Sequence, residues 1–148
     1  MKSGKHLVTF LIVVLLLLAL PNVISLLRGP AATPDVFSAA YTLEQANQLS
    51  IEQGKPVIVL ATADWCAPCQ ALKRGAMVDP GVVELINQRT IPVYLEESQS
   101  IDDIRSLGVR AYPTTLIVQQ GEVIARIEGG ASPDRFAEML RSELPPAP

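Results

Sequence analysis

Apolar residues fall into one long N-terminal run and several shorter, periodic runs beyond it. Residues 7–20 are apolar apart from Thr9, follow the basic residues Lys2 and Lys5, and are extended by an apolar patch at 23–27. Taken whole, residues 7–27 are long enough to cross a bilayer, whereas 7–20 alone has the length of a signal peptide. Because the basic flank stays in the cytoplasm in either case, the rest of the chain is predicted to be exported.

The sequence leaves both interpretations of this segment open. Residues 23–25 fit a cleavage site after Pro21, but the apolar residues around them and Arg28 fit an uncleaved anchor, which we favour. We expect a single-pass protein of the inner membrane with its domain on the periplasmic side, or a soluble periplasmic protein after cleavage. The predicted division is an anchor or signal peptide at 1–28, a Pro/Ala/Gly-rich linker at 29–34, one domain at 35–144 and a tail at 145–148.

Within the domain, helical and strand patterns alternate. Residues 56–62 are apolar without alternation, which is typical of a central strand covered on both faces. Pro92 favours an edge position for its own strand. The first predicted elements are a strand at 36–40, a helix at 42–53 with a Thr42/Gln45 capping box, and the strand at 56–62. A helix follows Cys69, is interrupted from Gly75, and continues in a second stretch from Pro80 to about Gln88. The remaining elements are a strand at 90–96, a helix at 101–107 capped by Ser100, a hairpin at 114–118 and 122–128, and a helix from Pro133 with Phe136, Met139 and Leu140 facing inward. This order predicts an α/β fold with a central sheet flanked by helices.

Both cysteines lie in the segment Trp65-Cys66-Ala67-Pro68-Cys69, between the predicted central strand and the following helix. The first turn of a helix has unpaired N–H groups and the positive end of the macrodipole, so a thiolate there is stabilised. We predict that Cys66 is the nucleophile. Cys69, one turn further along the same face, is the predicted resolving thiol.

Three other interpretations of the pair compete with this one. A structural disulfide closing so short a loop removes little entropy from the unfolded chain. A zinc site needs about four ligands, and the chain has only two cysteines and the remote His6, so no metal is expected. Chance is disfavoured because the strand before the motif and the helix after it supply the context of a redox site.

Charge and composition exclude other functions. Three of the twelve Lys and Arg residues precede residue 29, which leaves nine against fifteen acidic residues in the remainder. This acidic balance disfavours a nucleic-acid partner. No motif for a nucleotide or flavin is present, so no cofactor is expected and electrons must come from a partner thiol.

Two separated stretches carry a resemblance to a known family. Residues 55–70, KPVIVLATADWCAPCQ, and residues 109–116, VRAYPTTL, resemble the thioredoxin superfamily. The first is similar to its membrane-tethered and periplasmic branch, which includes the C-terminal domains of bacterial transmembrane thiol reductant conductors. The resemblance covers about residues 40–142 and implies a thioredoxin-like fold with a mixed sheet.

The resemblance also implies roles for residues around the pair. Pro113 would form a cis peptide bond facing the disulfide, although a strand-initial proline needs only a trans bond, and Tyr112 would line the substrate groove. Trp65 would pack on a substrate or only on the domain. Ala67 and Pro68 would support the site without supplying a side-chain donor, and a proline at this place accompanies low reduction potentials in the family.

Some positions depart from the family pattern or carry charge beside the site. Many thioredoxins have a buried aspartate six residues before the first cysteine, where this chain has Leu60. Proton transfer to or from Cys69 would then use water or another group, and Glu96 and Glu97, at the end of the next strand, are the carboxylates we suggest. Lys73 and Arg74 add positive charge, and one or both are expected on the solvated face of their helix.

These observations predict an exported thiol–disulfide oxidoreductase that reduces protein disulfides through Cys66 and Cys69. An oxidant or isomerase using the same pair is one alternative. The other is a redox-inert module that binds peptides around Trp65, Tyr112 and Pro113. The predicted partners are protein disulfide substrates, a membrane or periplasmic thiol donor, and the membrane itself through residues 7–27.

Overall fold

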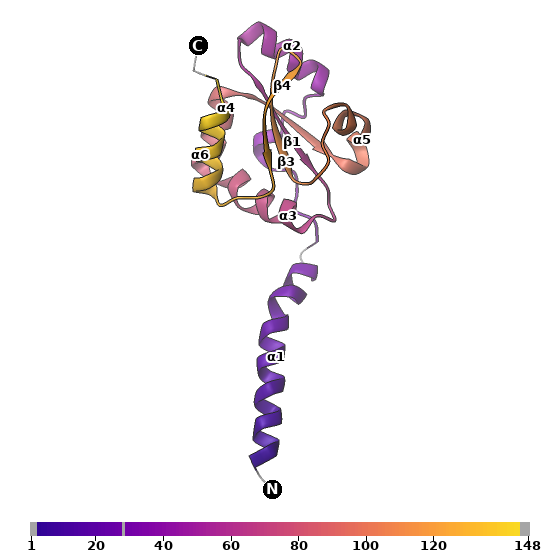
Figure 1. Cartoon of the computed structure of the whole chain (residues 1–148), viewed down its shortest axis with the longest axis vertical. Helices are drawn as coiled ribbons and strands as arrows, with labels where there is room; N and C mark the ends of the chain where they lie inside the picture. Colours follow the sequence, from indigo (N-terminus) through magenta and orange to yellow (C-terminus); the bar gives the residue numbers. More distant parts are fainter. Residues whose placement is uncertain (1–2, 28, 146–148) are drawn as a thin grey trace. The chain divides into compact units, whose positions relative to one another are not determined.

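The computed structural model of the protein describes residues 3–27 and 29–145, which belong to two units, 1–30 and 31–148 (Figure 1). The first unit contains the helix α1, Ser3–Leu27. Within the described ranges, no helix combines the length and hydrophobicity that crossing a membrane requires. The span predicted over residues 7–27 is therefore not confirmed; the side chains at 7, 9 and 21–27, which belong to that prediction and to the predicted cleavage site, lie outside the described part.

The second unit is built on a four-stranded sheet in the order β2-β1-β3-β4. Its strands are β1 (Val57–Thr62), β2 (Ile91–Glu96), β3 (Thr114–Gln119) and β4 (Glu122–Glu128). The β1–β2 pair is parallel, and the β1–β3 and β3–β4 pairs are antiparallel, so the sheet is mixed. The predicted central strand is confirmed as β1. Pro92 lies in the edge strand β2, where its missing N–H costs no ladder bond on the open side.

Helices cover both faces of this sheet (Figure 1). Alternate β1 side chains point to opposite faces: Ile58 and Leu60 join a core with α3 (Ala67–Arg74), α4 (Pro80–Arg89) and α6 (Pro133–Glu143). Val57, Val59 and Ala61 join a second core with α2 (Leu43–Gln53) and α5 (Glu97–Ser106). All six residues of β1 are buried, which explains why the strand lacks a polar alternation.

Local signals in the sequence account for most helix boundaries. Thr42 and Gln45 form the predicted capping box at the start of α2. After α3, the chain leaves the helix at Gly75, passes through the 3-10 turn η2 (Ala76–Val78) and starts α4 with Asp79 as N-cap and Pro80 at the first helical position. The predicted broken helix is therefore confirmed.

Two predicted elements differ from the structure. Residues 36–40 form no strand; instead Asp35–Phe37 is a 3-10 turn, η1, because Val36 and Phe37 are both buried in the core beside α4 and need a turn rather than an alternating strand. The helix predicted from Ser100 begins at Glu97, one turn earlier. Ser100 forms a kink inside α5, with φ −131° and ψ 31°.

Candidate active site

The redox turn, residues 63–69, connects β1 to α3 and carries both cysteines. Cys66 is the N-cap of α3, with φ −84° and ψ 107°, and its N–H donates to the Ala63 carbonyl at 3.1 Å. Cys66 and Cys69 form a disulfide with their Cα atoms 5.2 Å apart. The Cys69 N–H donates to Cys66 Sγ at 3.2 Å, so a first-turn donor of α3 points at the sulfur of the predicted nucleophile.

The neighbours of the two cysteines differ sharply in exposure. Cys66 and Cys69 are 4% and 1% exposed, and they pack with Ala63 and Tyr112 in a small apolar cluster. Ala67 and Pro68 are exposed on the first turn of α3. Because Pro68 has no N–H, the first turn of α3 offers one donor fewer to the sulfurs than it otherwise would.

The Tyr112–Pro113 bond lies against this cluster and is cis, as the resemblance implied. The carbonyl of buried Pro113 accepts a hydrogen bond from Gly129 N–H at 2.8 Å. The next residue, Gly130, approaches Pro68 closely enough that a Cβ built on it would lie 3.5 Å from the Pro68 carbonyl oxygen. The loop before α6 therefore borders the redox turn, a neighbour that our sequence analysis missed.

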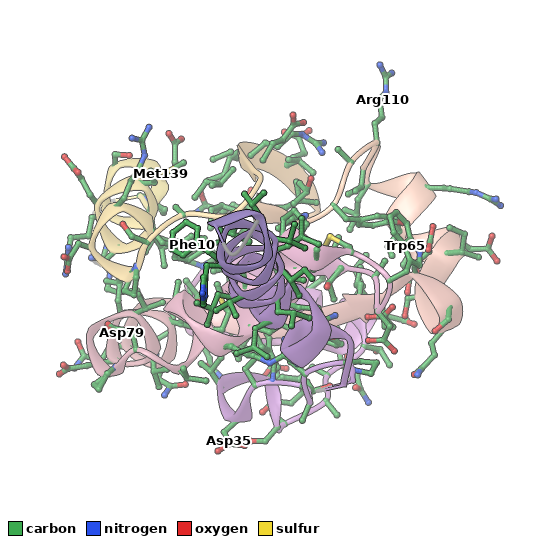
Figure 2. The ribbon with its side chains drawn as sticks, turned by 90° about the horizontal axis from the view of Figure 1, so that it is seen from below. Phe10, Asp35, Trp65, Asp79, Arg110 and Met139 are labelled. Carbon is green, nitrogen blue, oxygen red and sulfur yellow. A yellow bond between two sulfur atoms is a disulfide. The ribbon has the colours of Figure 1, made fainter. Side chains whose placement is uncertain are left out.

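An exposed aromatic rim, formed by Trp65, Tyr112 and Glu97, flanks the redox turn on the side of α5. Trp65 is 74% exposed and meets the Tyr112 ring edge-on, with ring centroids 6.0 Å apart and an interplanar angle of 80°. Its indole Nε1–H donates to Glu97 Oε2 at 2.7 Å, and Figure 2 shows the labelled Trp65 on this side of the domain. Burial, and then the Glu97 charge, raise the pKa of Tyr112. Trp65 is thus held in an exposed position.

Lys73 contradicts its predicted place on the solvated face of α3. Its side chain is only 1% exposed, whereas Arg74 is exposed as expected. Cys69 and Lys73 are four residues apart on one helix and therefore share its inward face. The charge pattern of the sequence did not reveal this, because a lysine whose partners come from other elements looks like any surface lysine.

Lys73 belongs to a closed set of four residues, the ionic ring, made of Asp64, Lys73, Tyr94 and Glu96. Lys73 Nζ donates to Tyr94 Oη at 3.2 Å and forms an ion pair with Asp64 Oδ1 at 3.4 Å. The Tyr94 hydroxyl donates to Glu96 Oε2 at 3.2 Å, and the Asp64 N–H donates to Glu96 Oε1 at 2.9 Å. The ring therefore ties together the redox turn, α3 and the end of β2.

Leu60 and Glu96 show how this domain departs from the family pattern. Leu60 is 1% exposed and packs in the core with α3 and α4, so no carboxylate lies at that position. Glu96, which the sequence analysis suggested, is 7% exposed at the end of β2. Burial raises the pKa of the Glu96 carboxyl, opposed in part by the hydrogen bond from Asp64 N–H.

Asp64 has a further contact that anchors the redox turn. Its carbonyl accepts from Gln70 Nε2 at 3.1 Å, and Gln70 Oε1 in turn accepts from the N–H of Ala31.

Within residues 3–27 and 29–145, no group of three or more His, Cys, Asp or Glu side chains is placed to hold a metal ion. The described site offers a buried disulfide-forming cysteine pair beside an exposed aromatic side chain.

Comparisons with known proteins agree with this geometry. The profile of the family described as "Thioredoxin-like domain" matches residues 43–143. The thiol:disulfide interchange protein DsbD of Escherichia coli strain K12 is 28% identical over 116 residues, which cover 74% of this chain and 20% of DsbD. DsbD of Shigella boydii serotype 4 is 26% identical over the same share of each chain. The chain spans about a fifth of the length of these relatives.

Solved structures extend the likeness to the fold. A thioredoxin from Thermus thermophilus superposes with a TM-score of 0.61 at 24% identity, over 69% of this chain and 83% of that chain. The DsbH oxidoreductase gives 0.62 at 16% identity, over 70% and 82%, and a disulphide isomerase from Xylella fastidiosa Temecula1 gives 0.60 at 18%, over 68% and 86%. These likenesses confirm the predicted α/β fold with its mixed sheet.

Proposed function

Since this chain belongs to the thioredoxin-like domain family and its Cys66–Cys69 pair is a disulfide at a helix N-terminus, we propose that it is an exported reductase of protein disulfides. Thiol–disulfide oxidoreductase activity is what the family shares. The direction of electron flow, the roles of individual residues and the location are our proposals. The observation that carries them is the Cys66–Cys69 pair at the start of α3, beside the Tyr112–Pro113 bond.

The proposed reaction starts from the reduced pair. The Cys66 thiolate attacks one sulfur of a substrate disulfide, forms a mixed disulfide and releases the other substrate sulfur as a thiolate, which takes up a proton. The Cys69 sulfur, after losing its proton, then attacks Cys66 Sγ, closes the Cys66–Cys69 disulfide and releases the second substrate thiolate. Two electrons pass to the substrate, and a dithiol partner must return them before the next cycle.

We assign binding of the substrate polypeptide to Trp65, Tyr112 and Pro113. The exposed Trp65 ring offers an apolar surface with fixed orientation, and Tyr112 connects that surface to the sulfur cluster. Exposed aromatic groups of this kind contribute much of the energy of protein contacts. Ala67 and Pro68 support the pair by adding neither a charge nor a side-chain donor beside it.

The reducing direction is supported by what surrounds Cys66. Strong stabilisation of the thiolate gives oxidants near about −120 mV, and weaker stabilisation gives values near about −270 mV. Ala67 and Pro68, the residues between the cysteines, supply no charge and no side-chain donor, so within the redox turn the thiolate is stabilised by the helix terminus and the Cys69 N–H. We expect a potential more negative than about −200 mV.

Thiol variants test the assignment of the two cysteines. Cys69→Ser should accumulate mixed disulfides on Cys66, because the resolving step is missing, whereas Cys66→Ser should trap few and lose activity. Equal trapping by both variants would show that the nucleophile is wrongly assigned. A pair that cannot be reversibly reduced would instead favour a redox-inert binding module.

Equilibration with glutathione buffers tests the direction. A reductase should be largely oxidised where the glutathione pool is mostly oxidised, because its potential lies below that of the pool. If the domain stays largely reduced there, it is an oxidant or isomerase.

Export is proposed from the basic flank Lys2, Lys5 and His6 before the apolar run at 7–20. The proposed partners are protein disulfides and a thiol donor in the same compartment, and the proposed location is the periplasmic side, either tethered through residues 7–27 or released. In cells expressing the full chain, an impermeant thiol reagent should label Cys66 from outside the cytoplasmic membrane. Carbonate extraction then separates the tethered form, which stays with membranes, from the released one. Labelling from the cytoplasm alone would contradict export.

A further inference from the structure

We propose that the ionic ring of Asp64, Lys73, Tyr94 and Glu96 positions the redox turn and sets its reduction potential, with Lys73 stabilising the Cys66 thiolate and Glu96 opposing it. This inference rests on the proposed function, because it concerns the same dithiol. It assigns to a buried lysine and a buried glutamate a role in setting the potential, which is separate from the proton transfer suggested for Glu96. Both act through other groups and are positioning residues.

The ring holds the redox turn at Asp64, two residues before Cys66. The backbone N–H of Asp64 binds Glu96, its carboxylate binds Lys73 and its carbonyl binds Gln70. Three contacts on one residue, from β2 and α3, leave the chain entering Cys66 with little freedom. Moving either charged partner, Lys73 or Glu96, therefore changes the position of the Cys66 sulfur.

The Lys73 ammonium lies close to the start of α3. Helical side chains lean toward the helix N-terminus, and residues four apart, such as Cys69 and Lys73, are neighbours. The contact between Lys73 Nζ and Asp64, a residue that precedes α3, shows that this side chain does run back toward the redox turn. The Lys73 side chain is 1% exposed, so water screens the ammonium poorly, whereas the side chain of its partner Asp64 is 55% exposed.

Glu96 supplies the opposing charge beside the same residue, Asp64, and accepts a hydrogen bond from its N–H. The groups facing it are Tyr94 on its own strand, Asp64 on the redox turn and Lys73 on α3, while the neighbouring Glu97 faces Trp65. The upward shift in the pKa of Glu96 agrees with a carboxylate that water hardly reaches.

This arrangement predicts two substitutions with opposite effects. Lys73→Met keeps most of the apolar stem and removes the positive charge, so the thiolate is less stable and the reduced fraction falls. Glu96→Gln removes a negative charge while keeping groups that pair with Asp64 N–H and Tyr94, so the reduced fraction rises. General loss of structure would move both in the same direction.

The test measures the full chain in glutathione buffers at about pH 7, with thiolate absorbance as a second readout. We expect the equilibrium constant for reduction to fall about tenfold in Lys73→Met, equivalent to about 30 mV, and to rise by about threefold to tenfold in Glu96→Gln. The pKa of the Cys66 thiol should rise in the first variant and fall in the second. Lys55→Met and Glu128→Gln, which alter charges outside the ring, are the matched controls and should leave both quantities unchanged.

Thermal unfolding of each variant confirms that the fold is retained, and Lys73→Arg, which keeps the charge, should recover most of the wild-type potential. Shifts of the same sign in the two variants, or none, would overturn the inference while leaving a reducible wild-type pair and the proposed function intact. A wild-type pair that glutathione cannot reduce reversibly would overturn both. A reduction potential near the wild-type value in the double variant, which combines Lys73→Met and Glu96→Gln, supports opposing effects of the two charges.

Discussion

Two consecutive glutamates, Glu96 at the end of β2 and Glu97 at the start of α5, have different surroundings beside the redox turn. Glu96 is buried in the ionic ring, where it accepts from Tyr94 and from the backbone of Asp64. Glu97 is half-buried in the aromatic rim, where it accepts from the exposed Trp65. Because α5 begins at Glu97, the chain direction changes between the two side chains and sends them to different sides of the turn.

The contrast shows that exposure, more than residue type, decides what a polar contact contributes. Exposed charged pairs contribute about 0 to 1 kcal/mol, because water screens them and solvates each partner when the contact is broken. A buried partner left without its counterpart costs several times more. The ionic ring should therefore govern stability and potential, and the aromatic rim should govern the encounter with a partner.

The largest expected effect is on Lys73. Lys73→Ala removes a buried ammonium and its packed stem, leaves Tyr94 Oη without this donor and leaves Asp64 without its ion-pair partner, so the free energy of unfolding should fall by about 3 kcal/mol. Denaturant titration measures it. The half-exposed Lys55 is the control, and Lys55→Ala should change stability by less than about 0.5 kcal/mol. A Lys73→Ala change as small as the control would remove the distinction between ring and rim.

Trp65→Ala should affect the rate of reduction of a protein disulfide and not the stability of the domain. Since the ring of Trp65 is 74% exposed, its loss should hardly alter stability, but the rate of reduction of a protein disulfide should fall by about tenfold. The rate with a small disulfide reagent provides the comparison and should be nearly unchanged. Equal losses of rate with the protein disulfide and with the small reagent would mean that Trp65 acts on the Cys66–Cys69 sulfurs and not on the protein partner.

The pH dependence of stability tests the burial of Glu96. The pKa of Glu96 is raised by burial above its ordinary value of 4.5, so the folded state binds this proton more tightly than the unfolded state. The stability this contributes is complete below about pH 4.5 and is lost as the pH rises through the folded pKa. Relative to Glu96→Gln, the wild-type protein should therefore lose stability as the pH rises above about 4.5 and through the folded pKa of Glu96. Urea titrations of both proteins at acidic and neutral pH measure this; a wild-type free energy of unfolding that rises with pH relative to that of Glu96→Gln would contradict the sign.

The smallest effect is expected from Glu97→Gln. The amide oxygen still accepts from the Trp65 indole, so unfolding should change by less than about 0.5 kcal/mol, and added salt should reduce any difference. The pKa of Tyr112, which the Glu97 charge raises, should move toward its ordinary value, and absorbance titration of the tyrosines detects this. An unchanged Tyr112 titration would mean that burial alone sets it.

Local patterns were enough to predict much of the second unit. The uninterrupted apolar residues of β1, the Thr42 capping box and the Asp79-Pro80 helix start all act within a few residues of chain, so the sequence displays them directly. The strand expected at 36–40 was wrong because two apolar residues, Val36 and Phe37, can fill a core from a turn as well as from a strand.

By itself the sequence determined the α/β order, the position of Cys66 at a strand-to-helix turn and its spacing from Cys69, because each depends on neighbours along the chain. Only the tertiary structure decided that Lys73 is buried, that Glu96 and Glu97 face different surroundings and that Gly130 borders Pro68. These contacts join residues up to about sixty positions apart, and their formation depends on how β2 and the loop before α6 pack beside the redox turn. A lysine can be buried with its charge only when groups from other elements form hydrogen bonds or ion pairs with it, and the residue pattern of its own helix does not show those groups.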